Sequence, residues 1–182
     1  MDYKLLIPSI IKVILCYFIF NSDTISFYMK IIYFYLTDTI LDCVIPILLH
    51  GKSIFNNELC RSRDYLFIDK ISDTFCYIFL LDYIYKSKEI EAKYTQVLLY
   101  LFIFRFIGTL ISFNKGEKKV LFFFPNFFLE LSILFNIFTH YKIDNIYKIG
   151  LTMIVILLKV FQEYLMHYEN LSIEEIINII SI

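Results

Sequence analysis

The chain has 182 residues, of which 59% are hydrophobic and 19% aromatic, and its mean hydropathy is +0.66. This composition excludes a disordered chain, and a soluble domain of this length has too little interior to hide so many bulky apolar side chains. Seventeen Lys and Arg residues against eighteen Asp and Glu residues give a net charge of −1, without the basic excess typical of nucleic-acid-binding proteins. We therefore expect a membrane protein whose partner is the lipid bilayer and not a nucleic acid.

Apolar blocks recur along the whole chain, and each is about long enough to form one membrane-spanning helix. Five blocks are clear, whereas the first is interrupted by Pro8 and Lys12, so that it either spans or lies at the interface. The sequence thus predicts an all-α, polytopic transmembrane helix bundle of five or six spans, formed by residues 1–182 as a single integral membrane domain. The expected spans are residues 5–20, 24–49, 65–85, 94–114, 120–139 and 149–168, followed by an amphipathic C-terminal helix over 171–182.

The second and third blocks carry their carboxylates in pairs. Asp38 and Asp42 lie four positions apart, as do Asp69 and Asp73, so that each pair shares one helix face. If the two helices pack antiparallel, the four carboxylates converge, and burying each in the membrane costs on the order of 3 kcal/mol. A bound divalent cation, protonation, or pairing with Lys and Arg can offset this cost, and the sequence leaves the three open. These four residues are the candidate metal ligands.

The fourth and fifth blocks contain one charge each, Arg105 and Glu130. Pro125 should kink the fifth helix, because its ring clashes with the preceding turn and releases the carbonyl of Leu121 from its helical partner. Asn126 and Glu130 then face the bundle interior, where a broken helix can line a binding site.

The sixth block carries Lys159, Glu163 and His167 at intervals of four residues, which places them in one stripe on a helix. Such a stripe can relay protons, or it can form salt bridges within a helix bundle. The candidate residues of an intramembrane polar cluster are Asp38, Asp42, Asp69, Asp73, Arg105, Asn126, Glu130, Lys159 and Glu163.

The most specific expectation is an ion pair between Asp73 and Arg105. Asp73 lies eight residues into the third block, and Arg105 lies nine residues before the end of the fourth. At about 1.5 Å per residue both charges are then roughly 12 to 14 Å from the same side of the membrane. An antiparallel hairpin would bring the two together, and Glu130 is the alternative partner for Arg105.

Two resemblances bear on function. The Asp69-Lys70-Ile71-Ser72-Asp73 segment resembles the CDP-alcohol phosphatidyltransferases, which implies a six-helix, metal-dependent lipid enzyme, although the first carboxylate pair has D-x-x-x-D spacing where that family has D-x-x-D-G. The segments RDYLFIDKISDTF, FRFIGTLIS and LFFFPNFFLEL resemble uncharacterised polytopic membrane proteins with an Arg-x-x-Gly helix, an FPN-containing helix and a nearby Glu. That family implies an architecture but no activity. The matching residues are Asp69, Asp73, Arg105, Gly108, Phe124, Pro125, Asn126 and Glu130.

The sequence lacks the common motifs of soluble enzymes. It contains no P-loop, GxSxG, HExxH or dinucleotide-binding glycine pattern. We therefore expect an integral, multi-pass membrane protein that handles a cation or protons through intramembrane carboxylates, with a divalent cation as the one cofactor that the sequence suggests. The alternative is a metal-dependent membrane lipid enzyme of the CDP-alcohol phosphatidyltransferase type. A homo-oligomer is compatible with both functions.

Overall fold

The structure is a computed structural model that describes residues 3–50 and 62–169, apart from the side chains of Asp42, Cys43, Pro46, Ile47 and Arg63. The described residues form helices joined by short turns, and they contain no strand. The prediction of an all-α helical bundle is therefore confirmed. The described residues divide into two compact units, unit 1 up to Leu80 and unit 2 from Leu81. The predicted helix over 171–182 lies outside the described residues.

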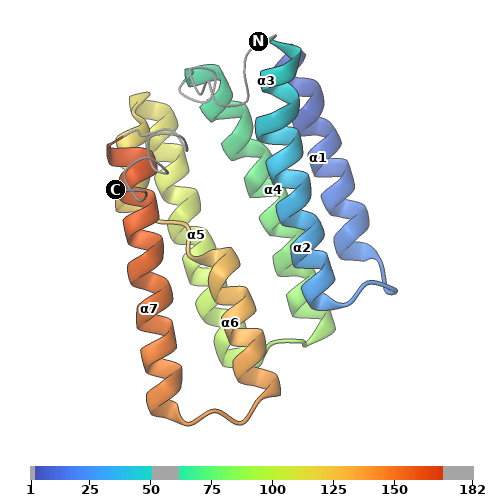
Figure 1. The fold of residues 1–182 in the computed structure, drawn as a ribbon, viewed down its shortest axis with the longest axis vertical. Coiled ribbons are helices and arrows are strands. Elements are labelled where there is room, and N and C mark those ends of the chain that lie inside the picture. The colour runs from blue at the N-terminus through green and yellow to red at the C-terminus, as the bar shows by residue number, and fades with distance from the viewer. Residues whose placement is uncertain (1–2, 51–61, 170–182) are drawn as a thin grey trace, which may run out of the picture. The chain divides into compact units, whose positions relative to one another are not determined.

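Unit 1 contains α1 (Tyr3–Asn21), α2 (Phe27–Asp38) and the greater part of α4 (Arg63–Ser87) (Figure 1). α2 runs directly into a π-helical turn, η1 (Thr39–Val44), and then into α3 (Ile45–Leu49). These three elements replace the single regular helix that the sequence predicts over 24–49. A π-helical turn is rare, and it is frequently found at functional sites.

Aromatic side chains form part of the core of unit 1. Phe34 of α2 is buried, and its ring centroid lies 6.0 Å from that of Phe20 on α1 and 5.8 Å from that of Tyr77 on α4. One ring thus joins three helices. Such aromatic contacts add to the free energy gained by burying the rings.

Unit 2 contains α5 (Ala92–Lys115), the 3₁₀ turn η3 (Lys118–Phe123), α6 (Phe128–His140) and α7 (Asn145–Glu163). α7 continues into a second π-helical turn, η4 (Tyr164–Tyr168). In Figure 1, the connections from α4 to α5 and from α6 to α7 lie at the same end of unit 2.

The largest departure from the predicted helices lies within residues 120–139. Pro125 does not kink a continuous helix. The chain instead forms η3, leaves helical geometry after Phe123 and begins α6 at Phe128. The break falls at Phe124 because a residue before proline is forced away from α-helical geometry. α6 therefore has only 13 residues, or about 20 Å, against roughly 30 Å for the apolar core of a bilayer.

Four helical stretches among the described residues are long and apolar enough to cross a membrane, and one of them includes η3, the break and α6. They are Tyr3–Asn21, Ala92–Lys115, Lys118–His140 and Asn145–Tyr168. The first block, which the sequence leaves between a span and an interfacial helix, thus has the length and hydropathy of a span. Two of the predicted spans, 24–49 and 65–85, are not among the four. Several side chains of the first lie outside the described residues, and the second carries Asp69, Lys70, Asp73 and Asp82.

α5 approaches the helix break closely at Gly108. A Cβ atom at this position would lie 2.2 Å from Cβ and 2.3 Å from Cγ of Phe124. The Cβ of Phe124 moves only with its own backbone, so rotation of the ring cannot relieve this clash. Close packing of the break against α5 therefore requires a residue without a side chain.

We predict that Gly108→Ala lowers the thermal unfolding midpoint of the purified protein in detergent, because overpacking costs about 1–3 kcal/mol. Gly150→Ala is the matched control, since a Cβ at Gly150 meets nothing within 4 Å. That change should leave the midpoint unchanged or raise it, because alanine is favoured over glycine in helices by up to about 1 kcal/mol. Equal shifts in both variants would contradict the packing described here.

Candidate functional site

Unit 1 contains a buried cluster of charges. The ammonium of Lys12 on α1 lies 2.5 Å from Oδ1 of Asp38 and 2.6 Å from Oδ1 of Asp73. Lys70 of α4 lies 2.6 Å from Oδ2 of Asp69 and 3.0 Å from Oδ2 of Asp73. Asp73 thus receives one ammonium on each carboxylate oxygen. Three helices contribute to this cluster, because Asp38 is the last residue of α2.

Burial differs sharply among the members of this cluster. Lys12 is fully buried, and the side chains of Asp69 and Asp73 are only 11% and 12% exposed, whereas that of Asp38 is 38% exposed. A buried lysine is tolerated only when its charge is paired, and here two carboxylates flank it. Asp38 is the member of the cluster that the surroundings of unit 1 can reach most easily.

The charges in this cluster do not balance. Among the described side chains, three carboxylates face two ammonium groups. Like charges held close together make it harder for all of the carboxylates to stay ionised. One further positive charge, a proton or a cation, would neutralise the excess.

The cluster is closed on the side of the α1–α2 turn. Cys16 and Cys76 lie one turn beyond Lys12 and Asp73, and both thiols are fully buried. Phe34, one turn from Asp38 on α2, is buried in the same layer. The exposed part of Asp38 therefore lies on the side of the cluster that faces away from Cys16, Cys76 and Phe34.

The expected convergence of four carboxylates is observed for Asp38, Asp69 and Asp73, while the side chain of Asp42 lies outside the described part of the chain. Among the described residues, no group of three or more His, Cys, Asp or Glu side chains is arranged to hold a metal ion. Pairing with lysine is the offset that these carboxylates make. A divalent cation site that includes Asp42 stays a prediction.

Unit 2 contains a second buried cluster, built around the break before α6. Arg105 donates from Nη1 to the carbonyl oxygens of Leu121, at 3.1 Å, and Phe124, at 2.6 Å. Glu163 of α7 accepts the backbone N–H of Asn126 on Oε1 at 3.1 Å, and its Oε2 lies 3.5 Å from Arg105 Nη1. Side chains from α5 and α7 therefore bind backbone groups that a continuous helix would satisfy by itself.

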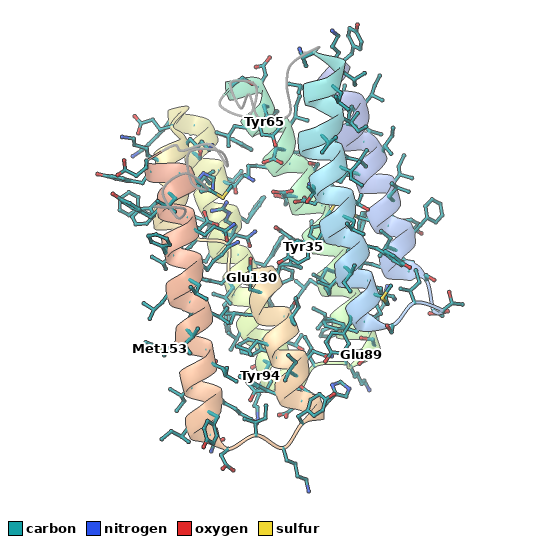
Figure 2. The ribbon with its side chains drawn as sticks, in the orientation of Figure 1. Tyr35, Tyr65, Glu89, Tyr94, Glu130 and Met153 are labelled. Atoms are coloured by element: carbon teal, nitrogen blue, oxygen red, sulfur yellow. The ribbon has the colours of Figure 1, made fainter. Side chains whose placement is uncertain are left out.

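Two more contacts complete the second cluster. Nε2 of His167 lies 3.0 Å from Oε2 of Glu163, and the ammonium of Lys159 lies 2.6 Å from Oε1 of Glu130. Glu130, labelled in Figure 2, is in the first turn of α6, where a negative charge is favoured by the helix dipole. With His167 neutral, two acids face two bases, so the charges of these residues balance.

The residues predicted as one polar cluster thus occur in two. Asp38, Asp69 and Asp73 belong to unit 1, and Arg105, Asn126, Glu130, Lys159 and Glu163 belong to unit 2. Lys12, Lys70 and His167 join them, although they were not among the predicted site residues. Each is an ionisable group within a largely apolar block, and this signal could have added all three.

The predicted ion pair between Asp73 and Arg105 is wrong in its partners. Asp73 binds Lys12 and Lys70, and Arg105 binds the carbonyls of the break and Glu163. The alternative partner of Arg105, Glu130, pairs with Lys159 instead. Equal depth along two helices does not fix the face on which each charge lies, and it ignores the carbonyls that a break releases.

No protein-family model, curated protein or solved structure matches this chain. The functional argument therefore rests on the geometry of the two clusters.

We predict strong energetic coupling between Arg105 and Glu163. Either Arg105→Gln or Glu163→Gln leaves the partner's buried charge without its counter-ion, which should cost about 3–5 kcal/mol of unfolding free energy. The double variant should lose clearly less than the sum of the two, as measured by chemical or thermal unfolding in detergent.

The exposed pair Lys86–Asp82, with an Nζ to Oδ2 distance of 2.6 Å, is the control for this cycle. The same cycle on that pair should give a coupling of less than about 1 kcal/mol. Additive losses at Arg105 and Glu163 would show that the guanidinium and the carboxylate do not act on one another.

Proposed function

We propose that this chain is a multi-pass integral membrane protein that takes up a proton or a small cation at Asp38, in competition with the ammonium of Lys12. One observation carries the proposal, namely the excess of carboxylates in unit 1 next to a fully buried lysine. Ionisable residues inside a membrane domain are costly, and they commonly mark ion or proton pathways.

The distribution of side chains supports the membrane part of this proposal. On α1, Lys12 is fully buried, whereas Phe18 and Ile7 are 64% and 52% exposed. Soluble proteins place such residues the other way round. A bilayer favours charges that face inward and large apolar side chains that face outward, as α1 has them.

The competition follows from the position of Lys12 between two carboxylates. With Asp38 ionised and unoccupied, the ammonium is shared between Asp38 and Asp73, at distances of 2.5 and 2.6 Å. A proton or cation on Asp38 removes the reason for this sharing, and Lys12 then stays with Asp73. Release of the ion restores the bridge. Binding at Asp38 and the Lys12–Asp38 contact thus oppose one another.

The second cluster does not suit the same role. Apart from His167, its acids and bases balance, and Arg105 and Glu163 are occupied with backbone groups of the break. Loss of either side chain would leave those groups unpaired. We therefore assign unit 2's cluster a structural role and place ion handling in unit 1.

The multi-pass arrangement predicts alternating accessibility of the helix connections. Single cysteines at Glu91, Glu117 and Asp144, in a background without native cysteines, should react with a membrane-impermeant maleimide from defined sides. Glu91 and Asp144 should label from one side and Glu117 from the other, because Glu91 and Asp144 lie at one end of unit 2 and Glu117 lies after α5. Labelling of all three from one side would overturn the arrangement.

Ion handling is tested by flux into proteoliposomes loaded with a dye sensitive to H⁺, Na⁺ or K⁺, each under an imposed gradient of the same ion. Wild-type protein should carry flux, and Asp38→Asn should abolish it, because the amide cannot accept the charge. Asp82→Asn is the control, since Asp82 pairs with Lys86 at an exposed position and should retain wild-type flux.

Wild-type flux in Asp38→Asn, or no flux of any of these ions in wild-type protein, would overturn the proposal. The lipid-enzyme alternative makes a different prediction for the same preparation. Turnover of a CDP-activated lipid, lost in Asp69→Asn, would replace ion handling by that activity.

A further inference from the structure

A hollow in unit 2 lies apart from both charge clusters. It has a volume of about 430 Å³ and lies between α7, α6 and the start of α5. Its walls include the rings of Tyr94, Phe135 and Phe138, with Lys148 and Met153 on the α7 side. Figure 2 labels Tyr94 and Met153 in the part of unit 2 towards the α6–α7 turn.

α7 leaves this space open because its first half packs loosely. The only buried residue of α7 is Glu163, at the far end of the helix, and Ile149 beside the hollow is 66% exposed. In a bilayer, an open apolar space of this kind is filled by lipid chains. The volume is within the range of protein sites that hold small molecules.

The aromatic wall is held in place by its own ring contacts. Tyr94 stacks on Phe135 with a centroid distance of 4.6 Å and an angle of 17°, and it lies 6.1 Å from Phe138. These contacts fix the rings before any ligand binds, which lowers the entropy cost of binding.

Two ammonium groups lie at the edge of this wall. Lys93 Nζ is 4.7 Å from the ring centroid of Tyr94, and Lys148 Nζ is 5.7 Å from that of Phe138. Lys93 is also 2.7 Å from Glu91 and is therefore neutralised locally. Lys148 has no carboxylate partner within the described residues, so its charge is available to a ligand.

Both lysines lie at helix starts, which is where headgroups are expected for helices that span a bilayer. Lys93 and Lys148 are in the first turns of α5 and α7, about 5 Å or less from the helix starts. The α4–α5 connection is tied to the last turns of α6, which precedes α7, since Glu91 N–H donates to Thr139 Oγ1 at 3.1 Å and Asn136 Nδ2 donates to the carbonyl of Glu89 at 3.0 Å. The cationic edge therefore belongs to one end of unit 2, where a spanning helix meets the interface.

We propose that this hollow binds an anionic phospholipid of the surrounding bilayer. Its phosphate pairs with Lys148, and an acyl chain packs against Tyr94, Phe135 and Phe138. A zwitterionic headgroup carries its own cation, which Lys148 repels, so the site selects for net negative charge. The proposal rests on membrane insertion, but it is independent of ion handling at Asp38.

A single tryptophan can report on the site, because the chain contains none. Met153→Trp places one in the wall of the hollow, and Ile149→Trp, also in the wall, is a second reporter should the first variant fail to fold. The protein is reconstituted in phosphatidylcholine vesicles that contain increasing fractions of brominated phosphatidylglycerol or brominated phosphatidylcholine, whose bromines quench tryptophan on contact.

Half-maximal quenching should need roughly five-fold less brominated phosphatidylglycerol than brominated phosphatidylcholine, as expected for one lysine at an anionic headgroup. Lys148→Gln should remove this preference, and Lys148→Arg should keep it. Lys142→Gln removes the same charge from the exposed α6–α7 turn and should also keep it. Leu157→Trp, on α7 but outside the hollow, should show no preference.

Equal quenching by the two lipids at Met153→Trp and Ile149→Trp would overturn the proposal. A preference that survives in Lys148→Gln would overturn it as well. The flux through Asp38 does not enter this measurement, so its failure and the failure of ion handling are distinguishable.

Discussion

Backbone groups without a helical partner are the constraint on which unit 2 depends. Pro125 ends η3 and separates it from α6, and the chain around it loses the hydrogen bonds of a regular helix. In an apolar environment each unpaired backbone group costs several kcal/mol. Arg105 on α5 and Glu163 on α7 remove that cost by binding these backbone groups. Arg105 donates to two carbonyls, and Glu163 accepts from an N–H.

Unit 1 meets the cost of buried charge differently. There the charges pair with one another instead of with the backbone, and Lys12 is enclosed by carboxylates from two other helices. An arginine suits the break because its planar group binds several oxygens at once, whereas a lysine suits a site in which one compact charge moves between two acceptors. Arginine in unit 2 therefore agrees with contacts that stay in place, and lysine in unit 1 agrees with a charge that changes its acceptor.

The helical fold was predictable because the apolar blocks are long and regular, and the charged residues within them marked both clusters. The freed carbonyl of Leu121 was also predictable from Pro125 alone. The partner of that carbonyl was not, because Arg105 is sixteen positions away and only tertiary packing brings it there. The prediction that Asp73 pairs with Arg105, made from their equal depth in the membrane, failed for a related reason. It gave no weight to Lys12, which lies in a block whose own span was in doubt.

The short length of α6 has a consequence for the barrier that the chain forms. Thirteen helical residues cover about two thirds of the apolar thickness of a bilayer, so at this position the insulation is completed by η3 and its phenylalanines, with a polar break between them. A break of this kind is where water and ions would leak most readily. The side chains of Arg105 and Glu163 occupy the backbone groups at that point, which leaves fewer groups there to bind water or an ion.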